Sequence, residues 1–184
     1  DVADLVVTTG GVSMGAYDTV KAVLSRVGMV EFVKVAMQPG MPQGLGQLAS
    51  GDRSIPIVTL PGNPVSAYVS FELFVRPLIR RMRGCADVNR PRVEASCTDS
   101  FSSPAGKTQF ARAILTESPD GWQVRPIGAQ GSHILGGLSR ADALAIVPDD
   151  VTSVSPGDRL LVMDLQRDAS RSEEHTSELQ SHSD

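Results

Sequence analysis

A glycine-rich stretch between an apolar run and a helical pattern constrains the fold of this chain more than any other feature. The run Leu5-Val6-Val7 is followed by residues 8–18, which read TTGGVSMGAYD. A loop of this kind at the carboxyl end of a strand brings bare backbone amides and a helix N-terminus up to an anion. The spacing matches neither the Walker pattern nor the dinucleotide fingerprint, so a nucleotide or phosphorylated cofactor would be bound in another way.

The residues before Gly84 predict an α/β fold with a partial three-layer parallel sheet. Ala3 to Thr9 is apolar without alternation, which is typical of a strand covered on both faces. After the glycine loop, Asp18 can cap a helix that Gly28 ends. A second strand is expected over residues 31–38.

Three expected turns follow expected strands in this first half. Prolines and glycines predict an irregular loop over residues 39–44, and a hairpin with arms at 45–49 and 55–60 comes next. The turns at 8–18, 39–44 and 61–67 would gather along one edge of an open α/β sheet. Such an edge is the usual place for a ligand crevice.

A long helix is expected after the third turn. Asn63 as N-cap and Pro64 at the first helical position predict its start, and Gly84 predicts its end. Pro77 in its interior should kink it. The apolar positions at helical spacing are Tyr68, Phe71, Val75, Leu78 and Met82.

The second half of the chain predicts a small all-β domain. We expect residues 1–84 to form the α/β domain, residues 85–92 a linker, and residues 91–166 a small barrel-like or sandwich domain. Five short strands separated by turn residues are expected at Val93–Cys97, Gln109–Thr116, Trp122–Pro126, Ala143–Val147 and Leu160–Asp164.

Residues 171–184 resemble translated sequencing adaptor and predict a disordered tail, although a natural acidic tail is the alternative. Setting aside its one arginine and four acidic residues from the 17 basic and 21 acidic residues of the chain leaves a net charge near −1. This balance indicates neither a nucleic-acid surface nor a strongly acidic protein.

The remaining composition favours a cytoplasmic protein with no membrane partner. No window reaches the length of a membrane span, and no leader opens the chain. Cys85 and Cys97 have neither zinc spacing nor a CxxC motif, which is typical of thiols in a reducing compartment. The chain starts without Met one step before a core strand, so we expect the start of a longer protein to be missing.

The chain resembles the molybdopterin molybdenumtransferase family of the MoeA type, which includes the E domain of gephyrin, and looks like a C-terminal fragment of it. The resemblance covers almost all of residues 1–166 in the family's order. The motifs that carry it are TTGGVSMGAYD (8–18), VKVAMQPGMPQG (33–44), LPGNPVSA (60–67), FARAIL (110–115) and GAQGSHILGGLS (128–139).

This resemblance implies an enzyme that inserts molybdate into adenylylated molybdopterin, releases AMP and completes the molybdenum cofactor. It further implies Mg²⁺ as cofactor, a homodimer in the full-length protein, and the upstream adenylyltransferase as a possible partner. Two alternatives stay open: the adenylyltransferase step itself, and a non-catalytic module that binds molybdopterin or partner proteins. A fragment without the family's earlier acidic residues is expected to be inactive alone.

Two residues are expected to be catalytic. By resemblance Asp18 is an active-site carboxylate that binds Mg²⁺ or positions molybdate, and its alternative role is the N-cap already described. Lys34 lies in an otherwise apolar strand, where a lysine is costly unless it reaches an anion or solvent. Its alternative role is an edge-strand lysine that keeps the sheet soluble.

The resemblance also implies a set of substrate-binding residues. Gln38 stands where many relatives carry a second lysine, which lowers the local positive charge, although glutamine still donates hydrogen bonds. The alternative role of the glycines is to form a tight turn. The alternative for Arg112 is a solvent-facing position, and the alternative for Ser132 is a plain turn. His133 is expected to be a structural loop histidine. The binding set is Thr9, Gly10, Gly11, Ser13, Gly15, Gln38, Pro61, Gly62, Asn63, Ser66, Arg112 and Ser132.

Overall fold

The fold is mixed α/β with a closed five-stranded β-barrel. The computed structural model describes residues 3–10, 23, 24, 26, 28–128 and 140–167. The contacts among these residues define two compact units, which the chain joins between Val75 and Arg76. Each unit is described by itself.

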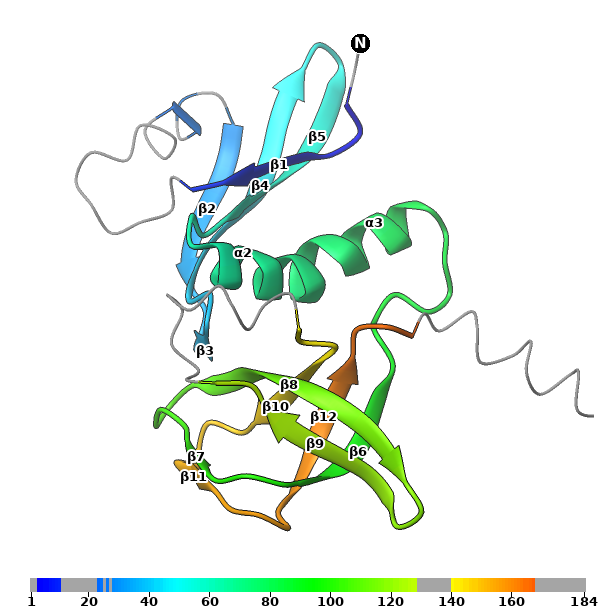
Figure 1. Cartoon of the computed structure of the whole chain (residues 1–184). Helices are drawn as coiled ribbons and strands as arrows, with labels where there is room; N and C mark the ends of the chain where they lie inside the picture. Colours follow the sequence, from blue (N-terminus) through cyan, green and yellow to red (C-terminus); the bar gives the residue numbers. More distant parts are fainter. Residues whose placement is uncertain (1–2, 11–22, 25, 27, 129–139, 168–184) are drawn as a thin grey trace, which may run out of the picture. The chain divides into compact units, whose positions relative to one another are not determined.

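The first unit contains a four-stranded sheet in the order β1-β5-β4-β2 (Figure 1). The strands of this sheet are β1 (Val6–Thr9), β2 (Gly28–Lys34), β4 (Pro42–Ser50) and β5 (Arg53–Leu60). The short strand β3 (Met37–Gln38) lies between β2 and β4 in the sequence. β1 pairs with β5 in parallel, whereas β4 is antiparallel to both of its neighbours. The parallel pair is therefore extended by a long hairpin and an antiparallel edge strand.

The hairpin is confirmed, but two predicted boundaries around it are wrong. β4 begins at Pro42, so residues 42–44 are strand rather than irregular loop; a proline is tolerated there because it is the first residue of the strand. The expected strand over 31–38 is two strands, since β2 ends at Lys34 and the chain turns before β3. Met37 N donates to Val35 O at 2.7 Å within that turn.

The helix predicted from Pro64 begins there and runs through three segments: α2 (Pro64–Ser70), a π-helical segment η1 (Phe71–Val75) and α3 (Arg76–Met82). The Asn63 carboxamide oxygen accepts from Val65 N at 3.1 Å and from Ser66 N at 3.2 Å, which confirms the N-cap. The π-helical segment ends two residues before Pro77, whose missing N–H interrupts the regular helical ladder.

The end of this helix also follows the prediction. Gly84 has φ 76°, and its N–H donates to Arg81 O at 3.0 Å, as expected of a glycine that terminates a helix. The predicted apolar stripe is correct only in part. Val75 is fully buried, but Phe71 and Met82 are exposed, and the buried face instead includes Val65 and Val69.

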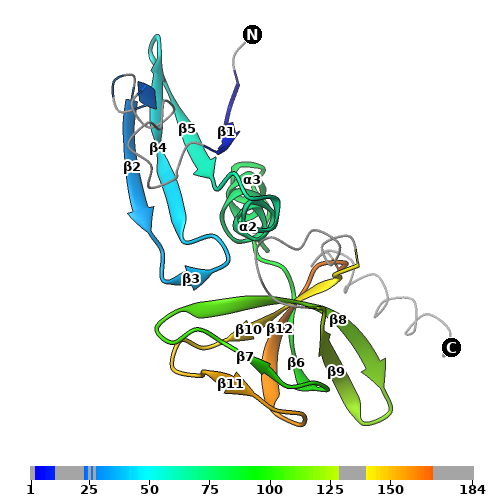
Figure 2. The ribbon, with the colours of Figure 1, turned by 60° about the vertical axis from the view of Figure 1, so that its left-hand side comes forward.

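The second unit is built on a closed barrel whose strands follow the order β10-β12-β6-β9-β8, with β8 pairing back to β10 (Figure 2). Its strands are β6 (Arg92–Cys97), β7 (Phe101–Ser102), β8 (Thr108–Ser118), β9 (Gly121–Pro126), β10 (Ala143–Val147), β11 (Ser153–Val154) and β12 (Arg159–Asp164). All five predicted strands are present. The short pair β7–β11, which lies at the side of the barrel, was not predicted.

Small side chains fill the barrel interior. Ala111 and Ala113 of β8 face Ala145 and Ala143 of β10 across the strand pair, and all four are fully buried. They pack with Val124 and other apolar residues into one core cluster. Closure therefore gives this unit a dry core without help from a helix. In the part of the chain that the structure describes, no helix is long and apolar enough to cross a membrane.

Candidate functional site

The carboxyl ends of β1 and β5 bring two predicted binding motifs together. Thr9 pairs with Leu60 at the end of the parallel ladder, and Gly10 N donates to Leu60 O at 2.9 Å. A Cβ placed on Gly62 would lie 3.2 Å from the Gly10 Cα. The two loops therefore leave the sheet in backbone contact, and glycine at both positions permits this approach.

The same edge of the sheet carries the end of β2 and the start of β4. Lys34 lies opposite Pro42, and Gly44 lies opposite Thr59, one residue before the end of β5. Because β4 runs antiparallel, its amino end meets the carboxyl ends of the other strands. The carboxyl ends of β1, β5 and β2 and the start of β4 therefore lie along one edge, although the predicted 39–44 turn follows β3 and not β2.

The predicted binding residues of the third turn have defined positions at this edge. Asn63 caps α2, Pro61 and Ser66 are buried, and Gly62 is exposed. Thr9 is also exposed, while Gly10 has φ 88°, a value that favours glycine. The arrangement leaves the backbone at Gly62 exposed beside the helix start, where a glycine lets a ligand approach closely.

Lys34 and Gln38 lie on either side of a tight turn and not along one strand face. Lys34 is the exposed last residue of β2, and Gln38 is half-buried in β3. Val35 N donates to Met41 O at 2.8 Å, which closes the turn at its base. Lys34 can thus reach solvent or an anion, consistent with both roles that the sequence left open.

Two buried hydroxyl groups at this edge were not predicted as site residues. Thr8 and Thr59 are partners in the parallel β1–β5 register, so their side chains share one face. Among the described residues neither Oγ1 atom has a hydrogen-bond partner, and both are buried. A buried hydroxyl without a partner is costly, which makes these atoms candidates for contact with a ligand. The sequence signal was threonine at the end of both parallel strands.

Arg112 lies in the second unit, in β8 of the barrel. Its neighbours Ala111 and Ala113 face the core, so Arg112 projects from the outer face, opposite Leu144 in the β8–β10 register. Arg112 is nevertheless only 2% exposed, and desolvation by burial lowers the pKa of its guanidinium. Its alternative reading as a solvent-facing arginine is therefore wrong.

Several predicted site residues lie outside the described residues: Gly11, Ser13, Gly15, Asp18 and Ser132, and with them His133. The Mg²⁺ assignment depends on Asp18. Among the residues that the structure does describe, no three His, Cys, Asp or Glu side chains are grouped to hold a metal ion. The described part of the site therefore does not provide a metal centre of its own.

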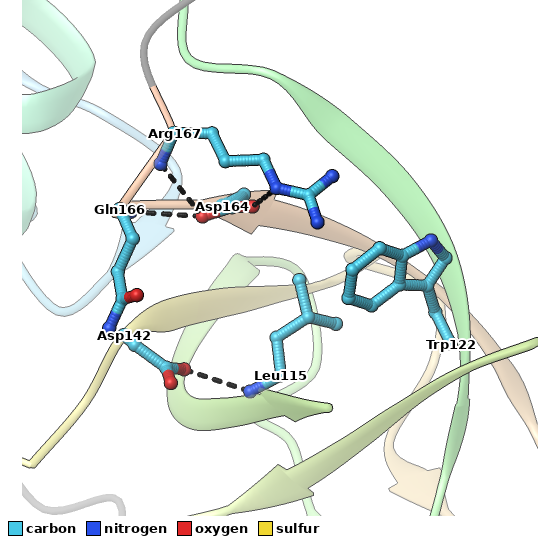
Figure 3. Close-up of a pocket in the computed structure, with 6 residues that line it drawn as sticks. All are labelled: Leu115, Trp122, Asp142, Asp164, Gln166 and Arg167. Carbon is cyan, nitrogen blue, oxygen red and sulfur yellow. Dashed lines mark hydrogen bonds and ion pairs between the residues drawn. The ribbon is translucent and has the colours of Figure 1, made fainter. Parts of the chain in front are cut away.

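A separate open pocket of about 110 Å³ lies on the barrel unit (Figure 3). The Asp164 carboxylate accepts from Gln166 N at 2.9 Å and Arg167 N at 3.1 Å, and Arg167 stacks on Trp122 at 4.7 Å. Asp142 accepts from Leu115 N at 2.8 Å. Arg167 thus joins the segment after β12 to β9, and Asp142 joins the segment before β10 to β8. No predicted site residue lines the pocket.

Two family models match the two halves of the chain. Residues 1–81 match the model described as a probable molybdopterin binding domain, and residues 94–165 match the model of the MoeA C-terminal region, domain IV. The first match contains the sheet edge with Gly10, Lys34 and Gly62. The second contains the barrel with Arg112.

Curated relatives and solved structures agree with these matches. Molybdopterin molybdenumtransferase 2 of Mycobacterium tuberculosis is 50% identical over 89% of this chain and 40% of the relative, and molybdopterin molybdenumtransferase of Haemophilus influenzae is 35% identical over 87% and 39%. A crystal structure of the molybdopterin biosynthesis MoeA protein from Pyrococcus horikoshii is 26% identical with a TM-score of 0.70, covering 90% of this chain and 38% of that one. The chain thus spans about two fifths of the length of these relatives. It belongs to the family of MoeA-type molybdopterin molybdenumtransferases.

Proposed function

We propose that the longer protein containing this chain inserts molybdate into adenylylated molybdopterin and releases AMP, as a step of molybdenum cofactor biosynthesis. The observation that carries the proposal is the junction of two motifs at one sheet edge. The Gly10 amide contacts the Leu60 carbonyl at 2.9 Å, so the glycine-rich loop and the Leu60–Asn63 turn start side by side. Such an edge is where α/β folds bind phosphorylated ligands.

The described residues would act by binding and orientation. The exposed Lys34 would attract the phosphate or molybdate anion, and the exposed Gly62 would let the ligand approach the backbone that precedes α2. The unpartnered hydroxyls of Thr8 and Thr59 would gain partners when a polar ligand is bound. Chemistry of this kind depends on placing molybdate against the dithiolene and the phosphoanhydride, and it needs no covalent nucleophile.

The proposal also includes residues and partners beyond the described site. Asp18 would be the catalytic carboxylate, and Mg²⁺ would bind there. Arg112 and Ser132 would contribute to substrate binding. The longer protein would be a cytoplasmic homodimer that receives its substrate from the adenylyltransferase.

The test is molybdate-dependent AMP release by the longer protein. Asp18→Asn should lower kcat about 100-fold, and Lys34→Ala should raise KM for molybdate about 10-fold because an anion contact is lost. Asp52→Asn, in the hairpin turn, and Lys107→Ala, before β8, are matched controls that should retain activity. Unchanged turnover in Asp18→Asn would refute the assignment of that residue.

The same assay separates the alternatives. A wild-type protein that binds molybdopterin but releases no AMP would favour the non-catalytic module. A protein that consumes ATP to adenylylate molybdopterin would instead be an adenylyltransferase. The presence of the barrel, which matches the MoeA C-terminal region, favours the molybdenum-inserting enzyme over that second alternative.

A further inference from the structure

Gln43 of β4 connects two walls of the candidate site through one buried carboxamide. Its Nε2 atom donates to Gly40 O at 2.5 Å and to Ser70 Oγ at 2.6 Å. Gln43 is 1% exposed and Ser70 is fully buried. One side chain thus joins the turn that precedes β4 to the end of α2.

The geometry at Gly40 makes this junction tight. Gly40 has φ 97°, and a Cβ placed there would lie 2.6 Å from Ser70 Oγ and 3.4 Å from Ser66 O. The turn therefore packs its bare backbone directly on α2. A side chain at Gly40 would push the two elements apart and would strain the backbone.

Both elements carry predicted binding residues. The turn over residues 35–41 is closed at its base by Val35 N and Met41 O, beside Lys34, and it contains Gln38. On the other side, α2 carries Ser66 and begins at the Asn63 cap. The Gln43 carboxamide fixes the tip of the turn against the helix, and the spacing between the two sets of residues follows from that contact.

We propose that Gln43 is a positioning residue for substrate binding, which sets the 35–41 turn against α2. This inference rests on the proposed function. A residue needed only for packing would be apolar at this depth, because burying a carboxamide is costly. Here the Oε1 atom has no partner among the described residues. The cost is offset by two directional contacts that an apolar side chain cannot make.

The first test measures the turn itself, by hydrogen exchange in the 184-residue chain. Gln43→Met keeps the length of the side chain and removes both hydrogen bonds, and Ser70→Ala removes one of them while leaving the contact to Gly40. We expect amides 37–41 to exchange about 10-fold faster in Gln43→Met, and less so in Ser70→Ala, with residues 55–60 unchanged. Gln47→Met, on the same strand and face but exposed, is the matched control.

The second test asks whether the turn's position matters to the substrate. In the longer protein, Gln43→Met should raise KM for molybdate about 5- to 10-fold with kcat nearly unchanged, since binding residues are displaced while the reacting groups are kept. An unchanged KM together with faster exchange at 37–41 would overturn the positioning role, and so would unchanged exchange. If wild type shows no molybdate turnover, the proposed function fails, and the exchange result still decides whether Gln43 holds the turn.

Discussion

The two units of this chain differ in how their strands end. The barrel closes on itself through the β8–β10 pair, and its interior side chains are fully or almost fully buried. The four-stranded sheet is open, with β1 and β2 at its two ends. It exposes large apolar side chains, including Met29 at 82%, Leu45 at 42% and Val7 at 40%.

The barrel is closed, whereas the four-stranded sheet leaves an edge that is open to contacts. The parallel β1–β5 pair gives the open sheet a carboxyl edge, where loops can leave side by side and present backbone to a ligand. The closed barrel instead satisfies its strands internally. Buried polar atoms without a partner occur among the described residues of both units, at Thr8, Gln43 and Thr59 in the first and at Ser103 and Gln109 in the second. The two units therefore differ in the exposed edge of the sheet and not in such atoms.

The largest effect is expected from a substitution that destabilises the open sheet and leaves the barrel intact. Gly46→Ala places a Cβ 2.1 Å from the Met29 backbone oxygen, so β2 and β4 must separate. We expect a loss of about 3 kcal/mol in the stability of the first unit. Amide hydrogen exchange in β4 and β5 would measure this loss. The fluorescence of Trp122, the single tryptophan, would follow the unfolding of the barrel during denaturation. Ala49→Val, at the exposed end of β4, should change little.

The converse change should destabilise the barrel and leave the open sheet intact. Ala145→Leu forces a larger side chain into the barrel, where Ala145 is fully buried between Ala111 and Val162. Overpacking should lower the free energy of unfolding of the barrel by about 2 kcal/mol. The denaturation midpoint followed by Trp122 fluorescence should fall accordingly. Exchange in β5 should stay as in wild type. Equal destabilisation of both units would show that they do not unfold separately. Leu161→Ala, on the outer face of β12, is the control.

The smallest effect concerns Cys97, a buried thiol of the barrel that donates to Asp99 O at 3.2 Å. Burial raises its pKa above the ordinary value of 9.0. Above that ordinary value the unfolded thiol ionises while the folded one stays protonated. Barrel stability should therefore fall as pH rises beyond about 9, by at most about 1.4 kcal/mol per unit. Denaturation followed by Trp122 fluorescence at pH 8 to 10.5 would show this loss. Cys97→Ala should make barrel stability less dependent on pH over this range, whereas Cys85→Ala should not.

Regular elements with clear boundaries could be predicted from the sequence. Ala143–Val147 matches β10 at both ends, because it is a continuous apolar run between Asp142 and the strand-breaking Pro148. The cap at Asn63 and the stop at Gly84 are also local signals. The short β7 and β11 could not be predicted, since each has only two residues and is defined by its partner.

The site was less predictable because its geometry depends on contacts between distant residues. The Lys34 and Gln38 positions follow from a turn whose closing bond joins Val35 to Met41, and no local pattern shows it. The burial of Arg112 depends on surroundings that a single arginine in a strand does not reveal. Gln43 looked like part of a loop, and only its contacts with Gly40 and Ser70 show its place.

The proposed function requires the open edge of the four-stranded sheet to bind the substrate. Hydrogen exchange of the 184-residue chain, with and without adenylylated molybdopterin and molybdate, measures this binding. We expect slower exchange at residues 60–66 and 34–41 when both ligands are present, with β10 and β12 unchanged. Protection confined to the barrel strands, or no protection at residues 60–66, would rule out binding at this edge.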